Sequence, residues 1–230
     1  MTLSSESVVT IIQARMNSAR LPGKVMLDWN GAPMLQRLIE RVATSEESDK
    51  VVVATSDTPA DDVIETLCKK LEVGCFRGSE QHVLERFVQT STAFNAQVVV
   101  RLTGDNPFVN GELVDCAVRE FFKHSPKIDY LSNTDNKYFP YGLFVEVIRA
   151  STLDEICQNA NAEEAEHVTL RIRKNPATFR TRCLSADREY PNISLTVDTY
   201  QDAVSLLPIF KSLVSKNEKF GLLEIATIKI

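Results

Sequence analysis

Short runs of β-branched residues that alternate with amphipathic segments constrain the fold of this sequence most strongly. Residues 8–12, 51–55 and 98–102 are almost continuously apolar, which is typical of strands buried on both faces of a parallel sheet. Residues 73–76 form a shorter run of the same kind. Between them, apolar residues recur at helical spacing, and we expect helices at residues 33–44, 57–71, 82–94 and 113–122.

The second half of the chain is more mixed. We expect strands at residues 143–148, 179–184 and 193–197, and helices at 151–160, 163–174 and 200–214, with Pro208 kinking or interrupting the last. No repeat, low-complexity tract or flexible linker divides the chain. The pattern therefore predicts one α/β domain over residues 1–230, with a mostly parallel sheet and helices on both faces.

Charge and composition exclude several classes of function. Lys and Arg number 26 against 31 Asp and Glu, a net charge of −5, whereas general nucleic-acid binding favours a basic face. No apolar run approaches the roughly 18 residues of a membrane helix, and the polar first seven residues do not resemble a signal peptide. Cytoplasmic localisation without nucleic-acid or membrane partners is the default expectation. Three histidines and five cysteines without a C-x-x-C pair do not indicate a zinc site.

Glycine marks the loops where a ligand is expected. Ligands of open parallel sheets bind outside the carboxyl ends of the strands. Only 8 of the 230 residues are glycine, yet Gly23, Gly78 and Gly104 fall in the loops after the first, third and fourth predicted strands. These loops should therefore contain the functional site.

The loop after the first strand is rich in cations. Arg15, Arg20 and Lys24 lie within ten residues of one another, directly after a buried strand. Such cations, together with backbone N–H groups, can cradle a triphosphate. The loop lacks the G-x-x-x-x-G-K-[ST] pattern of a Walker A motif. A solvated surface loop is the alternative interpretation.

Two aspartates follow other predicted strands. Asp105 comes just after the strand at 98–102, and Asp198 ends the predicted strand at 193–197. Paired carboxylates at such positions can hold a divalent cation against phosphate oxygens. Asp105 could instead form a turn or cap a helix, and Asp198 could be a helix N-cap.

The first loop also carries a family resemblance. Its motif Q-A-R-M-x-S-x-R-L-P-G-K resembles the nucleotide-binding signature of sugar-acid cytidylyltransferases, in particular of their spore-coat-polysaccharide branch. The 3-deoxy-manno-octulosonate and acylneuraminate cytidylyltransferases are more distantly similar. The resemblance continues in order through residues 76–86, 100–107, 129–133, 140–146, 166–169 and 195–198.

This resemblance implies a three-layer α/β/α nucleotide-diphospho-sugar transferase fold. It implies transfer of CMP from CTP to a sugar or sugar acid, with Mg²⁺ and release of pyrophosphate, for surface polysaccharide or glycoconjugate synthesis. Residues 8–125 would form the nucleotide half, and residues 126–230 the acceptor half with the second metal carboxylate. The residues carried over are Gln13, Ala14, Arg15, Arg20, Lys24, Arg77 and Arg86 for the nucleotide, Asp105 and Asp198 for the metal, and Arg15, Lys24 and Asp105 for catalysis.

The acceptor side is predicted from the same resemblance. His167 could orient or deprotonate a sugar hydroxyl, although a lone helical histidine is often structural. Phe144 stands where the family usually has an acidic residue, and Ala165 where it usually has Arg, so the acceptor is expected to differ. The candidate acceptor residues are Asp129, Asn133, Tyr141, Gly142, Glu146, Glu166 and His167.

Two other functions remain open at this point. A metal-dependent glycosyltransferase of similar architecture would hold a ready-made nucleotide sugar, but the crowded basic loop favours a triphosphate. A non-catalytic nucleotide-sugar-binding protein would not need the pair Asp105 and Asp198. Release of pyrophosphate separates all three. A homodimer is a further expectation, since relatives are commonly dimers.

Overall fold

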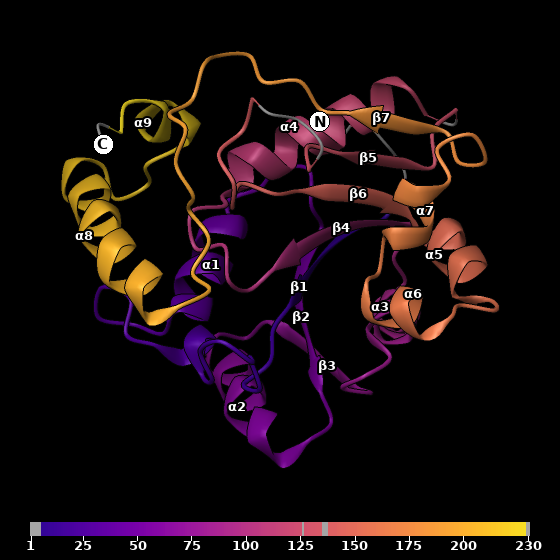
Figure 1. Cartoon of the computed structure of the whole chain (residues 1–230), viewed down its shortest axis with the longest axis horizontal. Helices are drawn as coiled ribbons and strands as arrows, with labels where there is room; N and C mark the ends of the chain where they lie inside the picture. The colour runs from indigo at the N-terminus through magenta and orange to yellow at the C-terminus, as the bar shows by residue number, and fades with distance from the viewer. Residues whose placement is uncertain (1–5, 126, 135–137, 229–230) are drawn as a thin grey trace.

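A seven-stranded mixed sheet organises the chain in the computed structural model, which describes residues 6–125, 127–134 and 138–228 (Figure 1). The strand order is β3-β2-β1-β4-β6-β5-β7, and among the described pairings only those of β6 are antiparallel. The predicted α/β class with a mostly parallel sheet is confirmed. The strands are β1 Val8–Gln13, β2 Lys50–Ser56, β3 Gly74–Gly78, β4 Val98–Thr103, β5 Tyr130–Ser132, β6 Glu146–Arg149 and β7 Thr181–Cys183.

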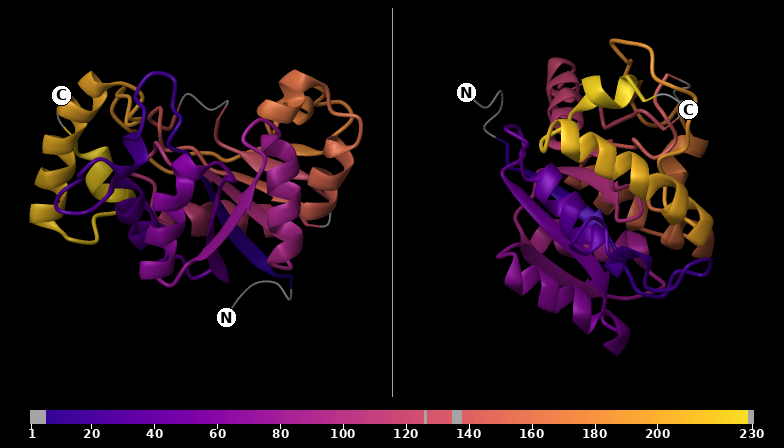
Figure 2. Two further views of the ribbon diagram at one scale, coloured as in Figure 1. Left: turned by 90° about the horizontal axis from the view of Figure 1, so that it is seen from below. Right: turned by 90° about the vertical axis from the view of Figure 1, so that its left-hand side faces the viewer.

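Helices cover both faces of the sheet and complete three layers (Figures 1 and 2). Successive side chains of a strand point to opposite faces, so Val98 and Val100 enter one apolar core while Val99 enters the other. The first core includes side chains of α1 Met34–Val42, α2 Asp62–Lys70, α4 Gly111–Lys123, α8 Tyr200–Lys216 and α9 Leu222–Ala226. The second includes those of α3 Val83–Ala93, α5 Ala150–Cys157 and α7 Leu170–Lys174, with α6 Ala162–Glu166 beside α3.

The first half of the chain matches its predicted order of strands and helices, with two short 3₁₀ turns added, η1 Lys24–Met26 and η2 Pro59–Asp61. In the second half, the predicted strand at 143–148 is shorter and becomes β6. The predicted helix at 163–174 divides into α6 and α7, because the backbone leaves the helical region at His167. Pro208 lies inside α8, which continues to Lys216.

The predicted strand at 193–197 is wrong. Leu195 and Val197 are buried, which explains the apolar pattern, but the segment runs beside loops instead of a strand. Leu195 N donates to Tyr141 O at 2.6 Å, and Val197 N donates to Asp105 O at 2.9 Å. The segment thereby brings Asp198 to the loop that follows β4.

The direction of the strands places the candidate loops at one edge of the sheet. β1 pairs in parallel with β2 and β4, and β2 with β3, so their carboxyl ends lie together. The loops after Gln13, Gly78 and Thr103 therefore meet at this edge. Among the described residues, no helix combines the length and apolarity needed to cross a bilayer.

Candidate active site

The loop after β1 is held in a fixed shape by its own backbone and by one buried carboxylate. The carbonyl of Met16 accepts from Ser18 N at 2.9 Å and from Gly23 N at 2.8 Å. Gly23 has φ +74°, a left-handed conformation that glycine adopts without strain. Lys24 follows directly in η1, so the loop delivers its ammonium group back to the sheet edge.

Asp61 anchors this loop from outside, and the sequence analysis missed it. Its Oδ1 accepts from Met16 N at 2.7 Å, and its Oδ2 accepts from Thr55 Oγ1 and from Ser56. Burial raises the pKa of this carboxyl, but the hydrogen bonds from Ser56, Met16 and Thr55 outweigh it and hold the pKa below its ordinary value. Asp61 therefore fixes the first loop against the end of β2. Aspartate is common near the start of a helix, so its type and position alone do not indicate this role.

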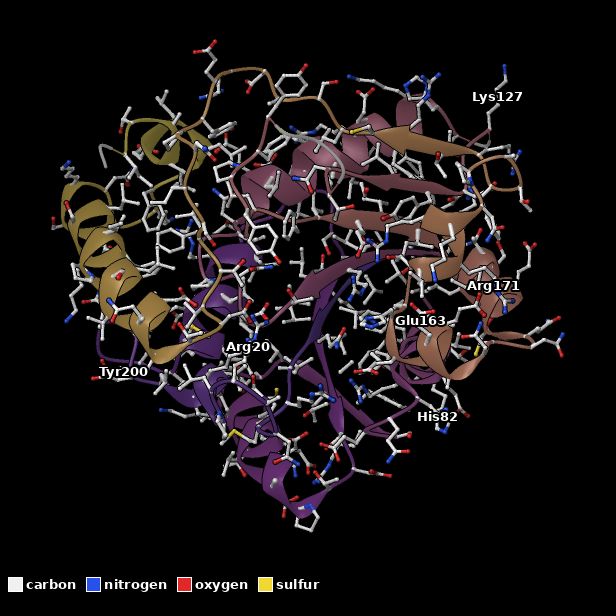
Figure 3. All side chains as sticks on the ribbon, viewed as in Figure 1. Arg20, His82, Lys127, Glu163, Arg171 and Tyr200 are labelled. Atoms are coloured by element: carbon white, nitrogen blue, oxygen red, sulfur yellow. The ribbon has the colours of Figure 1, made fainter. Side chains whose placement is uncertain are left out.

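Lys24, Asp105 and Asp198, which the sequence predicted to work together, meet in space. Lys24 Nζ lies 2.9 Å from Asp105 Oδ2 and 2.9 Å from Asp198 Oδ1, and its side chain is only 9% exposed. Arg20 Nη2 lies 2.8 Å from Asp198 Oδ2 at the surface. Figure 3 places Arg20 on the side of the molecule that carries α8. We call these four residues the carboxylate–lysine cluster.

Backbone contacts position the two aspartates. Gly104 N donates to Gln13 O at 2.8 Å, and a Cβ on Gly104 would lie 3.1 Å from that carbonyl oxygen. Thr103 Oγ1 donates to Asp105 Oδ1 at 2.7 Å. Neither aspartate caps a helix, because Thr199 is the N-cap of α8 and Asn110 that of α4. The alternative interpretation that Asp105 and Asp198 are helix N-caps is therefore excluded.

The donor set of this cluster fits a hard divalent cation. The two carboxylates converge on one point that already attracts a cation, the ammonium of Lys24. Mg²⁺ prefers oxygen ligands and is often bound by one or two carboxylates plus phosphates and water. Within the described residues, no group of three or more His, Cys, Asp or Glu could form a metal cage. A metal here would therefore share its coordination with a ligand.

Two further cations lie near each other without a carboxylate to pair with. Arg15 is half-buried and makes no hydrogen bond or ion pair with any described residue. Arg86 is fully buried and donates from Nη1 to Ser79 O at 2.6 Å, while its Nε and Nη2 have no partner among the described residues. Burial, and after it the Arg15 charge, lowers the pKa of Arg86 to about 10. Such an arrangement can accept an anionic or carbonyl-rich ligand.

Arg77, in contrast to these two cations, is fully paired. Its Nε donates to Ser56 O at 3.1 Å and its Nη2 to Thr58 O at 2.8 Å. Its Nη1 pairs with Asp62 at 2.6 Å and Glu65 at 2.9 Å. All three nitrogens are thus engaged in joining β3 to the end of β2 and to α2. The structure gives Arg77 a role in the scaffold, in contrast to the predicted contact with the nucleotide.

A second polar cluster lies on the other face of the sheet. Arg101 Nη1 pairs with Glu146, its Nη2 donates to Gln13 Oε1 at 3.2 Å, and Tyr130 Oη donates to Glu146. Burial raises the pKa of Glu146, but Arg101 and the hydroxyls of Tyr130 and Thr169 outweigh it and keep the pKa below its ordinary value. We call Gln13, Arg101, Tyr130 and Glu146 the arginine–glutamate cluster.

The sequence analysis included Glu146 and Gln13 in the site but missed Arg101 and Tyr130. A signal was present, because Arg101 is a charge within an otherwise apolar buried strand. Ala14 is buried in the first core, and its N donates to Ala54 O at 3.2 Å.

Several predicted acceptor residues hold the backbone. Asn133 is fully buried, donates to Leu143 O at 2.6 Å and accepts from Val145 N at 2.9 Å. Gly142 has φ +98°, and a Cβ there would lie 2.6 Å from the carbonyl carbon of Leu195. Both residues therefore fit a role in shaping the path of the chain, and the Asn133 side chain is not available to a substrate.

The remaining predicted acceptor residues are spread out. Tyr141 is 58% exposed and makes an edge contact with Phe144 at 4.7 Å between ring centroids. Glu166 ends α6 and His167 follows it, both exposed, near the face where Glu163 and Arg171 lie in Figure 3. Asp129 precedes β5, pairs with Arg180 and lies at the opposite edge of the sheet, level with the start of β4. The structure does not bring Asp129 to the site.

Comparison with known proteins identifies the class to which this site belongs. A family model described as cytidylyltransferase matches residues 9–225. The chain is 39% identical over 212 residues to the spore coat polysaccharide biosynthesis protein SpsF of Bacillus subtilis (strain 168), covering 89% of this chain and 86% of SpsF. The chain belongs to the cytidylyltransferase family.

Solved structures agree with this assignment. A cytidylyltransferase from Leptospira borgpetersenii serovar Hardjo-bovis (strain JB197) matches with a TM-score of 0.89 and 29% identity, over 98% of this chain and 99% of that one. A CMP:2-keto-3-deoxy-manno-octonic acid synthetase complexed with CTP matches with a TM-score of 0.69 and 20% identity, over 90% and 99% of the two chains. The predicted α/β fold of nucleotidyltransferases is thereby confirmed.

Proposed function

We propose that the protein transfers CMP from CTP to a hydroxyl of a sugar or sugar acid and releases pyrophosphate, in the synthesis of a surface polysaccharide or glycoconjugate. The observation that carries this proposal is the carboxylate–lysine cluster at the carboxyl edge of the parallel strands, the edge at which Arg15 also follows β1. Membership of the cytidylyltransferase family supports CTP as the nucleotide. The similarity to SpsF supports the polysaccharide context.

The first loop would bind the triphosphate. Arg15 has no partner among the residues that the structure describes, so its guanidinium is available to a phosphate. Lys24 and Arg20 hold carboxylates through ion pairs that a highly charged phosphate chain can compete for. Arg86 offers two buried, unpartnered N–H groups beside Arg15. Together these groups would neutralise the charge of the phosphates and of the departing pyrophosphate.

Asp105 and Asp198 would hold Mg²⁺, which supplies charge neutralisation at the phosphates when bound. Attack on an α-phosphate requires no covalent enzyme intermediate, so orientation and electrostatics carry the reaction. The fixed shape of the first loop and the backbone contacts of Gly104 and Val197 supply that orientation. Arg15, Lys24 and Asp105 are the proposed catalytic residues.

The acceptor would bind on the side of the arginine–glutamate cluster. His167 and Tyr141 are exposed and free to contact a sugar, whereas Glu146 is buried with its oxygens already engaged. Phe144 contacts Tyr141 and offers an apolar ring where a carboxylate is usual. A pocket that has lost polar groups discriminates against substrates that need them. We therefore expect poor activity on 3-deoxy-manno-octulosonate and N-acetylneuraminate.

The experiment that tests the proposal is a pyrophosphate-release screen. Each of the four nucleoside triphosphates is combined with Mg²⁺ and a panel of sugar acids, neutral sugars and sugar phosphates. The proposal expects release with CTP that depends on both the acceptor and Mg²⁺ and stops with EDTA. Release with another nucleotide but not with CTP would overturn the choice of base. Efficient conversion of either of the two common sugar acids would overturn the altered acceptor.

A further inference from the structure

Every oxygen of the two candidate metal carboxylates is already engaged by the protein, in a hydrogen bond or an ion pair. Asp105 Oδ1 accepts from Thr103 Oγ1 at 2.7 Å, and Asp105 Oδ2 accepts from Lys24 Nζ at 2.9 Å. Asp198 Oδ1 accepts from the same ammonium at 2.9 Å, and Asp198 Oδ2 pairs with Arg20 at 2.8 Å. A divalent cation entering between the carboxylates must therefore displace Lys24.

The charges in the cluster also balance. Two carboxylates carry −2, and Lys24 with Arg20 carries +2, so the cluster has no net charge to attract a free cation. The Lys24 side chain is 9% exposed, and the Asp105 and Asp198 side chains are 26% and 18% exposed. Limited contact with water strengthens these ion pairs relative to ones in bulk solvent.

From this saturated cluster we infer that Lys24, assisted by Arg20, keeps the metal site closed until a triphosphate draws the two cations away. The inference rests on the proposed function, because the phosphates that attract Lys24 and Arg20 are those of the nucleotide. A phosphate chain carries several negative charges and competes directly with the carboxylates for an ammonium group. Once Lys24 moves to the phosphates, the freed carboxylate oxygens become ligands for the metal. Nucleotide and metal binding are then coupled through one lysine.

The test measures metal and nucleotide binding separately, without turnover. Mn²⁺ is titrated into the full-length protein without nucleotide, and free Mn²⁺ is followed by electron paramagnetic resonance. Wild type should bind Mn²⁺ weakly, and Lys24→Met should bind it about tenfold or more tightly, within the range typical of coupled sites. CTP titrated into the same proteins in EDTA should show the opposite change, weaker binding to Lys24→Met.

Matched variants assign the effect to the cluster. Lys123→Met removes a lysine that pairs with Glu120 in the last turn of α4, and should leave both affinities unchanged. Lys24→Met combined with Asp198→Asn should lose the gain in Mn²⁺ binding, because one ligand is removed. Arg20→Gln removes the exposed second cation and should give a smaller gain than Lys24→Met.

Lys24→Met should bind Mn²⁺ more tightly and CTP more weakly. This pair of opposite changes distinguishes a lysine that closes the metal site from one that only stabilises the fold, since a destabilised site would bind both ligands more weakly. Unchanged or weaker Mn²⁺ binding by folded Lys24→Met overturns the inference. If that variant shows no cooperative thermal transition, Arg20→Gln decides, and the absence of any gain overturns it. Because the Mn²⁺ titrations contain no nucleotide, their outcome is independent of the pyrophosphate screen that tests the proposed function.

Discussion

The carboxylate–lysine cluster and the arginine–glutamate cluster place similar charges in different surroundings. In the first, two partly exposed carboxylates share Lys24, and Arg20 pairs at the surface. In the second, Glu146 is almost fully buried and receives Arg101 and Tyr130 at once. A ligand can reach the partly exposed carboxylates of the first cluster and compete for their partners, whereas a buried pair that loses one member is strongly destabilised. The first cluster is thus suited to ligands and the second to holding the sheet together.

The largest effect is expected from breaking the buried cluster. Glu146→Gln removes a buried carboxylate and leaves the partly buried Arg101 guanidinium without its counter-charge, which should lower the free energy of unfolding by about 3–5 kcal/mol. Urea denaturation measures the change. Glu163→Gln removes a carboxylate that is 60% exposed and pairs with Lys174, and should cost under about 1 kcal/mol. Equal losses in the two variants would contradict the contrast drawn between buried and exposed pairs.

The loss of stability in Glu146→Gln is also predicted to depend on pH. The pKa of Glu146 is lower in the folded protein than in the unfolded chain, so unfolding takes up a proton in acid. The stabilisation is complete above the ordinary pKa and is lost as the pH falls through the lowered folded value. The stability difference between wild type and Glu146→Gln should therefore be largest near pH 7 and shrink below about pH 5. A difference that grows in acid would show that Glu146 is protonated in the folded state.

The next effect concerns turnover. Asp105→Asn and Asp198→Asn should each lower kcat by roughly 10²–10³-fold, the size typical of removing one electrostatic stabiliser. Neither residue caps a helix, so thermal stability should change little. Asp187→Asn, which removes an exposed carboxylate paired with the adjacent Arg188, is the control. Near-normal turnover by Asp198→Asn would contradict a role for Asp198 in catalysis, and its ion pairs with Lys24 and Arg20 would then be its only function.

The sequence predicted the first cluster better than the second for a physical reason. Lys24 lies in the loop after β1 and Asp105 in the loop after β4, so the topology of a parallel sheet brings them to one edge. Asp198 reaches that edge although its expected strand is absent, because the apolar residues Leu195 and Val197 dock on the core and bond to loop carbonyls.

The second cluster depends on contacts between β4, β5 and β6, which no local pattern reveals. Antiparallel β6 sets Glu146 opposite Arg101, and its direction was not predictable from its residues. For the same reason the sequence could not show that Asp129, a predicted acceptor residue just before β5, lies at the opposite edge of the sheet. The break at His167 between α6 and α7 was also missed, since the apolar spacing runs through it.

A smaller effect is expected on nucleotide affinity. Arg15→Ala should weaken CTP binding by about 1.5–3 kcal/mol, the value of a charge-assisted contact, which is roughly ten- to hundredfold in Kd. Lys24→Ala should weaken CTP binding by a similar amount. Arg77→Ala is the informative comparison, because the contacts of Arg77 belong to the scaffold and CTP affinity should persist in the folded variant. Calorimetry in EDTA measures all three, and unchanged affinity in Arg15→Ala and Lys24→Ala would remove the triphosphate assignment.

The smallest effect is expected at the exposed acceptor side. His167→Ala should lower turnover on the true acceptor without changing CTP affinity or thermal stability, because His167 is exposed at the end of α6. The loss of a general base should lower kcat about 10²-fold or more, and the loss of a residue that only orients the hydroxyl should lower kcat by less. His124→Ala, at the end of α4, is the matched control. Weaker CTP binding in His167→Ala would instead assign this histidine to the nucleotide site.

The most direct test of which region binds the nucleotide is a CTP titration followed through backbone amide NMR signals. The account predicts shifts in residues 14–24, at Gly104 to Asn106 and at Asp198, where the first loop and the carboxylate–lysine cluster meet. The amides of Asp129 and Arg180, at the opposite edge of the sheet, should not move. Shifts confined to that opposite edge, with none in the first loop, would contradict the account.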